Sequence, residues 1–267
     1  MNAYPRDEKF FRQSARIADE LNKLGASVQV LKNGEVSVCV EKDGKIRVLG
    51  AENAQFCVYL DKDKYLSRAL EKSGIRVFNS PKSIETCDDK ALTFLELENA
   101  GLTVPETIPA PLCYTPNAVA DEEFLKRVVE RLSLPIIIKT SYGSFGAGVK
   151  KADTMTELKE IAQEFLHVPH LYQRYISSSF GRDVRVIVVG GKALGGMERV
   201  ANCGEFRSNI ELGGTGKKIT LTESFRRAAE GAANALGLDY CGVDLMYGKD
   251  GEPIVCEVNS NAFFEGF

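Results

Sequence analysis

Histidine is scarce in this sequence, and its cysteines form no paired motif. The two histidines among 267 residues, His167 and His170, make nucleophilic hydrolysis by a Ser-His-Asp set a poor candidate. Pro169 lies between them and no third ligand is apparent, so we expect surface-loop residues rather than metal ligands. The seven cysteines include no CxxC pair, which argues against a structural zinc site. Packed, reduced thiols are expected in the apolar runs at Cys39, Cys57, Cys241 and Cys256.

Long apolar runs and an excess of one charge are also missing. No apolar run approaches the roughly 20 residues that span a bilayer. No charged and then apolar leader stands at the start, so we expect a cytoplasmic protein without a membrane partner. The net charge of -3 supplies no basic field for nucleic acid. With 44% hydrophobic and 27% charged residues, the chain is globular in composition and long enough for two or three small domains.

The first part of the chain has the alternation of a small α/β unit. A helical spacing of apolar residues runs over 10–24 and ends at Gly25. Strands are predicted at 28–31 and 36–40, joined by a tight turn at Asn33-Gly34. Further strands at 56–60 and 75–78 flank a helix at 64–72, which favours a parallel sheet. Only residues 1–4 precede the first helix, where such a unit usually opens with a strand, so we expect the start to be clipped.

The rest of the chain alternates helices and strands without repeats. A helix over 88–99 begins near Lys90, and a proline-rich extended link follows at 104–111. Asp121 is a helix cap, and Thr154 with Glu157 forms a capping box. Strands are predicted at 171–176, 183–189, 192–200, 240–247 and 253–258, with a helix at 220–236 and a loop at 213–217 that lacks the features of a Walker P-loop.

One stretch combines a buried strand, a lysine and a glycine loop. Branched apolar residues at 136–138 predict a buried strand that ends at Lys139. Glycines at 143, 146 and 148 let the backbone approach a ligand closely and expose its N–H groups, which suits a phosphate. A plain hairpin with a glycine turn explains the pattern equally well.

Acidic and amide side chains interrupt the last two predicted strands. Glu257 and Asn259 are two residues apart and therefore share one face of a strand. Asp244 lies on the neighbouring strand and can join them. Two carboxylates and an amide oxygen are hard ligands that suit Mg²⁺. The alternative is polar strand ends that face water, but an unpaired charge in an apolar strand is costly.

Two further places carry charge in a suggestive pattern. Arg207 and Asn209 follow one another in the segment 205–209, and a guanidinium is suited to phosphate or carboxylate. A surface ion pair explains Arg207 as well. Asp183 and Arg185 alternate with valines and so share one strand face, which a partly exposed sheet also explains.

Together these features resemble the ATP-grasp superfamily, and within it the RimK-type α-L-glutamate ligases. The resemblance covers about residues 80–267 and, more loosely, the first domain. Its marks in chain order are Lys90 at a helix start, 136–139 with 143–149, Gln173-Arg174-Tyr175-Ile176, 181–185, 205–209 with Gly213-Gly214, 242–244 and 257–260. Arg174 departs from relatives that carry an acidic residue there. The chain stops at Phe267, where relatives usually add a closing helix.

The fold that this resemblance implies mixes α/β and α+β parts. We expect an N-terminal α/β domain at 1–85, a central α+β subdomain with the glycine lid at 86–169, and a C-terminal α+β subdomain with the metal site at 170–267. The two α+β subdomains would clamp ATP between them.

The resemblance also implies roles for individual residues. Nucleotide contacts are implied for Lys90, Lys139, Gly143, Ser144, Gly146, Gly148, Gln173, Arg174, Tyr175, Ile176, Asp183, Arg185, Arg207, Ser208 and Asn209. Arg207 and Lys139 would carry the catalytic charge. Two Mg²⁺ ions, or Mn²⁺, would be bound by Asp244, Glu257 and Asn259.

The implied reaction is the joining of a carboxylate to an amine at the expense of ATP. The carboxylate, of a small molecule or a peptide, becomes an acyl phosphate, and an amino-acid amine such as glutamate attacks it to give an amide, ADP and phosphate. Such chemistry asks the protein mainly for positioning and charge neutralisation. A nucleotide-binding module without turnover and a different ligase on this fold, such as a dipeptide ligase, remain alternatives. A homo-oligomer is compatible with the sequence.

Overall fold

The fold was analysed in a computed structural model, which describes residues 1–5, 7–98, 100–143, 146, 148–202, 204–208 and 213–264. Its helices are α1 (Glu8–Lys23), α2 (Lys64–Lys72), α3 (Pro81–Asp88), α4 (Lys90–Glu96), α5 (Glu122–Leu132), α6 (Met155–Phe165) and α7 (Glu223–Ala235), with a 3-10 turn η1 (Ser177–Ser179). Its strands are β1 (Ser37–Val40), β2 (Ile46–Leu49), β3 (Phe56–Val58), β4 (Arg76–Phe78), β5 (Thr107–Pro109), β6 (Ile136–Thr140), β7 (Val149–Ala152), β8 (His170–Arg174), β9 (Arg182–Val189), β10 (Lys192–Val200), β11 (Thr215–Ile219), β12 (Tyr240–Tyr247) and β13 (Pro253–Asn259).

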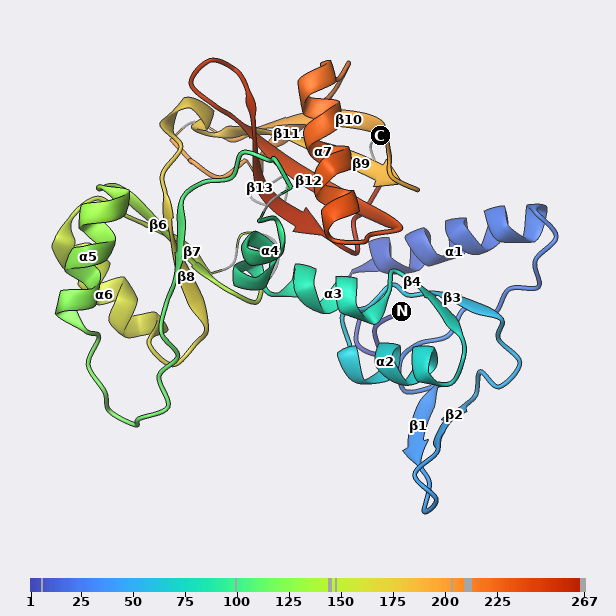
Figure 1. Ribbon diagram of the computed structural model, residues 1–267. Helices are drawn as coiled ribbons and strands as arrows, with labels where there is room; N and C mark the ends of the chain where they lie inside the picture. Colours follow the sequence, from blue (N-terminus) through green and yellow to red (C-terminus); the bar gives the residue numbers. More distant parts are fainter. Residues whose placement is uncertain are drawn as a thin grey trace.

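The N-terminal part is built on a short parallel strand pair. The β3 and β4 strands pair in parallel, and α2 connects them, as the alternation predicts. The side chain of Asp63 caps α2, and Gly25 ends α1 with a φ of 87°. Leu66 and Leu70 of α2 pack in the same core as Val77 of β4. In Figure 1 this part lies at the right, with the β1–β2 hairpin projecting from it.

One strand prediction in this part is wrong. Residues 28–31 form no strand, and the 36–40 segment pairs instead with β2, which the sequence analysis missed. Both candidate turns contain a glycine after Asn or Asp, so local chemistry does not choose between them. The segment before Asn33 instead lies against the chain start: the Met1 amino group donates to Leu31 O at 2.9 Å. Asn33 N donates to Met1 O at 2.7 Å.

An antiparallel sheet of four strands, in the order β5-β8-β6-β7, forms the middle of the chain. Helices α5 and α6 lie beside it, at the left in Figure 1. Ile136, Ile138 and Tyr172 pack with these helices, so alternate residues on the same strands face the other way. The predicted extended link contains β5. The boundary predicted at residue 170 falls at the start of β8, so this sheet continues to Arg174.

His170 corrects the prediction of a surface residue. It lies on β8, is 4% exposed, and its Nε2 is 3.0 Å from the Tyr172 hydroxyl. Burial lowers the pKa of this imidazole, although backbone carbonyls oppose the shift. Cys39 is exposed rather than packed, whereas Cys241 is buried as expected.

The last part is an antiparallel sheet of five strands in the order β11-β10-β9-β12-β13. Short turns join β9 to β10 and β12 to β13, and both predicted hairpins are confirmed. Small side chains of α7, among them Ala229, Ala232 and Ala233, let this helix pack closely on the core that includes Val186 and Val243. Residues 215–217, expected in a loop, belong to the edge strand β11. Among the described helices, none has the length and apolar character that a membrane crossing requires.

Candidate functional site

A cavity of about 120 Å³ lies between the four-stranded and five-stranded sheets, and most of the predicted site residues line it. They are Lys90, Lys139, Gly143, Gly146, Gln173, Arg174, Tyr175, Ile176, Asp183, Arg207, Ser208, Asp244 and Glu257. Gly148, Arg185 and Asn259 are not in its lining, and Ser144 and Asn209 lie outside the described residues. The fold therefore brings together positions that are far apart in the chain.

A larger cavity of about 890 Å³ lies entirely within residues 1–70. None of the predicted site residues lines it. We place the candidate site in the smaller cavity because lysines, arginines and carboxylates converge there. Its volume is below the roughly 300–1,000 Å³ of ordinary small-molecule sites.

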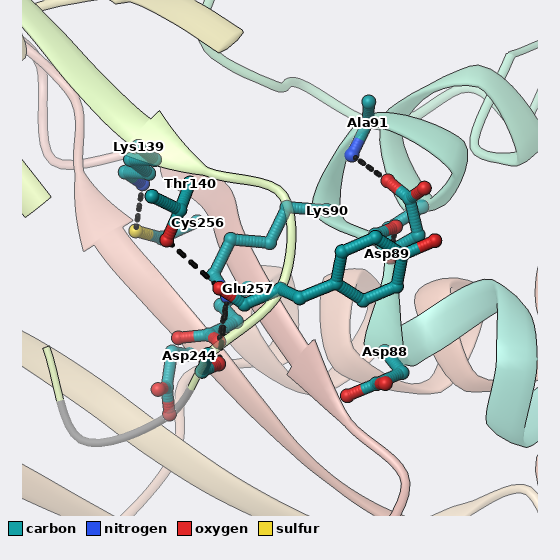
Figure 2. Close-up of polar contacts among 12 residues, drawn as sticks. Asp88, Asp89, Lys90, Ala91, Lys139, Thr140, Asp244, Cys256 and Glu257 are labelled. Carbon is teal, nitrogen blue, oxygen red and sulfur yellow. Dashed lines mark hydrogen bonds and ion pairs between the residues drawn. The ribbon is translucent and has the colours of Figure 1, made fainter. Parts of the chain in front are cut away.

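Lys90 connects the glycine loop to the last sheet (Figure 2). The Asp89 carboxylate caps α4, and the first helical residue is Lys90, whose N donates to Ser141 O at 3.0 Å. The Lys90 ammonium donates to Gly143 O at 2.9 Å and lies 3.6 Å from Glu257 Oε1. One cation thus contacts both walls of the cavity.

Lys139 is a buried cation with little to neutralise it. It is 8% exposed, and the hydrogen bond that the described residues give its ammonium is to Cys256 Sγ at 3.7 Å. A thiol is a weak acceptor, and a buried charge is stable only when it is paired. Burial raises the pKa of Cys256, although Lys139 opposes the shift. The Lys139 ammonium is therefore available to an anion in the cavity.

Arg207 approaches the glycine loop from the other side. Its guanidinium forms a fork with Glu205, with Nε at 3.1 Å and NH2 at 2.9 Å from the carboxylate oxygens. Its NH1 donates to Gly146 O at 3.3 Å. Hydrogen bonds from Arg207 lower the pKa of Glu205 to about 2. The ion pair that the sequence allows for Arg207 is present, whereas its role as a ligand of phosphate or carboxylate stays a prediction.

A row of buried charges crosses the five-stranded sheet. Arg199 donates to Asp183 from Nε at 2.7 Å and from NH2 at 2.5 Å. The same NH2 lies 3.0 Å from Asp244 Oδ2. Arg185 forms a fork with Asp244 at 2.7 and 2.6 Å. Two arginines and two aspartates thus form one neutral cluster.

Burial and the neighbouring arginines shift the pKa values of the carboxyls in this cluster in opposite directions. Burial alone would raise the pKa of Asp244, but Arg185 and Arg199 outweigh it, and the pKa is lowered. Burial raises the pKa of Asp183, although Arg199 opposes the shift. Asp244 is therefore held as a carboxylate. The sequence analysis missed Arg199, which directly follows Glu198 in β10 and therefore lacks the apolar neighbours that identified Asp244 in β12.

The residues predicted to bind metal are arranged as two carboxylates with an amide close by. Asp244 and Glu257 are directly opposite in the β12–β13 register, and a bulge at this point turns both Cys256 and Glu257 toward the cavity. Asn259 follows on the Glu257 face, and its buried Nδ2 has no hydrogen-bond partner among the residues that the structure describes. Within the described part of the chain, no cluster of three or more His, Cys, Asp or Glu side chains suits a metal. The two carboxylates and the amide offer oxygen donors, which suit an ion such as Mg²⁺ better than zinc.

The segment 173–176, which we call the hinge, begins at the end of β8. Its contacts show why an arginine at position 174 is compatible with the site. Arg174 donates from Nε to Glu106 at 2.6 Å and from NH2 to the Arg131 carbonyl at 2.9 Å, toward α5. Gln173 is 2% exposed, lines the cavity, and donates to Thr107 Oγ1 at 2.9 Å. The guanidinium of Arg174 thus points away from the cavity, which leaves its backbone for a contact there.

Comparison with known protein families identifies the family of this chain. The family profile of the RimK-like ATP-grasp domain matches residues 87–267. The chain belongs to the RimK-like ATP-grasp family. This confirms the resemblance drawn from the spaced motifs.

Curated relatives of this RimK-like chain make glutamate conjugates, by their names. N-acetylaspartylglutamate synthase A from Homo sapiens is 38% identical over 213 residues, which are 79% of this chain and 52% of that protein. Beta-citrylglutamate synthase B from Homo sapiens is also 38% identical over 213 residues, 79% of this chain and 53% of that protein. A probable alpha-L-glutamate ligase from Coxiella burnetii (strain Dugway 5J108-111) is 38% identical over 201 residues, 74% of this chain and 64% of that protein. The chain spans about half the length of the first of these relatives.

Solved structures confirm the ATP-grasp fold that the sequence predicts. D-alanine–D-alanine ligase from Bacillus anthracis complexed with ATP has a TM-score of 0.70 at 21% identity, covering 98% of this chain and 84% of that chain. The ATP-grasp ligase PsnB, complexed with a precursor variant, Mg and ADP, has a TM-score of 0.67 at 23% identity, covering 100% of this chain and 90% of that chain. At these identities the likeness establishes the fold.

Proposed function

We propose that this chain catalyses ATP-dependent joining of a carboxylate to an amine. The observation that carries the proposal is the cavity in which Lys90, Lys139 and Arg207 face the carboxylates of Asp244 and Glu257. Such an arrangement neutralises a polyphosphate from one side and offers oxygen ligands for a divalent cation on the other. Membership of the RimK-like ATP-grasp family and the glutamate conjugates named in its relatives support it.

The side chains of this site divide into three tasks. Lys90, Lys139 and Arg207 neutralise the phosphates, and the glycine backbone at Gly143 and Gly146 closes over them. The hinge at 173–176 and the carboxylate of Asp183 position the nucleoside. Oxygen ligands from Asp244, Glu257 and Asn259 would hold two Mg²⁺ or Mn²⁺ ions.

When bound, the divalent cation supplies charge neutralisation at the transferred phosphoryl group. The carboxylate substrate attacks that phosphorus and becomes an acyl phosphate, and ADP leaves. An amine then displaces phosphate and forms the amide bond. The residues of the chain contribute orientation, charge and exclusion of water, because water would hydrolyse the acyl phosphate.

Glutamate is our first candidate for the amine, because the names of three relatives contain it. The acid is a small molecule or a peptide carboxylate. A cytoplasmic location and a homo-oligomer stay predictions of the sequence.

ADP release with Mg·ATP, glutamate and a panel of carboxylic acids tests the proposal, with product identification by mass spectrometry. We expect Glu257→Gln to lower kcat about a hundredfold or more while the protein stays folded. The control Glu223→Gln changes an exposed residue in the first turn of α7 and should leave kcat within about twofold. Near-normal ADP formation by the Glu257 variant would refute the metal assignment.

A nucleotide-binding module without turnover is the second candidate. The observation that favours it is that both oxygens of Asp244 are engaged by Arg185 and Arg199. Tight binding of Mg·ADP together with no ADP release across the whole acid and amine panel would establish it.

A further inference from the structure

Arg185 holds the same carboxylate that the proposed metal requires. It lies directly opposite Asp244 in the β9–β12 register. Its Nε and NH2 contact the two oxygens of that carboxylate at 2.7 and 2.6 Å, in the fork that a guanidinium forms best. With the additional contact from Arg199, both oxygens of Asp244 are engaged.

The two arginines at Asp244 differ in how firmly they are held. Arg199 also forms a fork with Asp183, and its side chain is 5% exposed. The side-chain hydrogen bonds of Arg185 within the described residues are those to Asp244, and its side chain is 22% exposed. Within the described residues, Arg185 is therefore held by one carboxylate and Arg199 by two.

Arg185 packs against a glycine on one side. Its aliphatic stem passes over Gly242, where an added Cβ would lie 3.8 Å from Arg185 Cδ. Glu257 lies on the far side of Asp244, on the neighbouring strand β13. A divalent cation between Asp244 and Glu257 would repel this guanidinium and compete for the oxygens it contacts.

We propose that Arg185 is a resident counter-ion of the metal site. It neutralises Asp244 while no metal is bound, and Mg²⁺ binding with nucleotide displaces it. The freed guanidinium then binds an anion beside the metal, while Arg199 stays on Asp183 and Asp244. The proposal rests on the metal assignment of the proposed function and adds an order to it: metal and nucleotide bind first, and the anionic group of the acid is recruited afterwards.

Thermodynamic linkage between Mg²⁺ binding and anion binding makes this order measurable. If Mg²⁺ must displace Arg185, removing Arg185 strengthens Mg²⁺ binding and weakens anion binding. Removing a residue that only supports the fold is not expected to strengthen one affinity and weaken the other.

Arginine-selective ¹⁵N NMR tests the displacement directly. Arg185→Lys and Arg199→Lys identify the two Nε–H signals. On addition of MgCl₂ to the ADP complex we expect the Arg185 signal to shift and its hydrogen exchange to accelerate at least about tenfold, while the Arg199 signal keeps its position. ADP with EDTA should leave both unchanged. An Arg185 signal that does not respond to Mg²⁺, or one that responds no more than Arg199, overturns the proposal.

Calorimetry with Arg185→Gln supplies the second test. We expect the ADP complex of this variant to bind Mg²⁺ about tenfold more tightly than the unsubstituted protein, and its Mg·ADP complex to bind inorganic phosphate at least about fivefold more weakly. Arg227→Gln removes an exposed arginine on α7 and should change neither affinity. Unchanged or weaker Mg²⁺ binding, or unchanged phosphate binding, overturns the proposal.

If Arg185→Gln fails to fold, Arg185→Lys keeps the charge but loses the fork, and the same two changes are expected in smaller measure. None of these readouts needs turnover. Failure of the ADP complex to bind Mg²⁺ at all would overturn the proposed function as well, whereas Mg²⁺ binding without a response at Arg185 overturns this proposal alone.

Discussion

Replacement of Arg199 by methionine removes the cation that two buried carboxylates share. Methionine is flexible and fills most of the same space. Asp183 and Asp244 are 8% and 4% exposed, so neither gains water in compensation. Breaking a buried ion pair by removing one partner costs about 3–5 kcal/mol. That is a large part of the roughly 5–15 kcal/mol that stabilises a folded protein.

The stability lost on replacing Arg199 should depend on pH in a defined direction. In the unsubstituted protein the arginines lower the pKa of Asp244, so its stabilisation is present above the ordinary carboxyl range and is lost as the pH falls through the lowered value. Without Arg199, burial dominates at Asp183, whose pKa is already raised. Burial destabilises the ionised carboxyl and protonation removes that cost, so the variant should recover stability relative to the parent as the pH is lowered.

Urea unfolding followed by circular dichroism measures both effects. We expect the midpoint to fall by about 1–2 M at pH 8. The double variant Asp183→Asn with Arg199→Met should regain part of the loss, because one of the two stranded charges is gone. A loss below about 1 kcal/mol, or one that does not change with pH, would refute the account of this cluster.

Three further outcomes test other parts of the site. Arg174→Glu should place a second carboxylate beside Glu106 and lower the stability by about 1 kcal/mol, yet leave the KM for ATP within about twofold; a tenfold rise in KM would show that the guanidinium faces the nucleotide. Gly148→Ala should raise the KM for ATP and lower the Tm, because φ is +75° there and the added Cβ would meet Thr140 Oγ1; unchanged values would contradict the close approach. Alkylation of Cys256, followed by peptide mass spectrometry, should be slow at pH 7 and accelerate toward pH 10, because burial raises the pKa of this thiol. ATP should block the labelling, and labelling that ATP leaves unaffected would place Cys256 outside the nucleotide site.

Local features of the sequence predicted the elements whose signals are contained within a few residues. Asp121 caps α5, and the capping box of Thr154 and Glu157 begins α6. The hairpins β9–β10 and β12–β13 follow from short turns between apolar strands. Because each of these depends on neighbours in the chain, pattern alone was sufficient.

Pairings between distant segments were not predictable in this way. Residues 215–217 of the edge strand β11 were expected in a loop, and the sequence of this strand carries no apolar alternation. Its state depends on hydrogen bonds with β10. Residues 28–31 have the composition of a strand but form none, because the neighbouring hairpin closes on β2 instead.

For the candidate site, too, the sequence predicted some features and only the tertiary structure decided others. The order and spacing of Lys139, Asp244 and Glu257 led to the prediction of phosphate and metal binding, which stays a prediction, and the family profile confirms the ATP-grasp resemblance. Only the tertiary structure decided that Lys90 contacts Glu257 across the cavity and that Arg199 joins Asp183 to Asp244. Residue type fixes which charges a chain carries, but their partners depend on which strands become neighbours, and that is set by burial of the two sheets' cores rather than by the charges themselves.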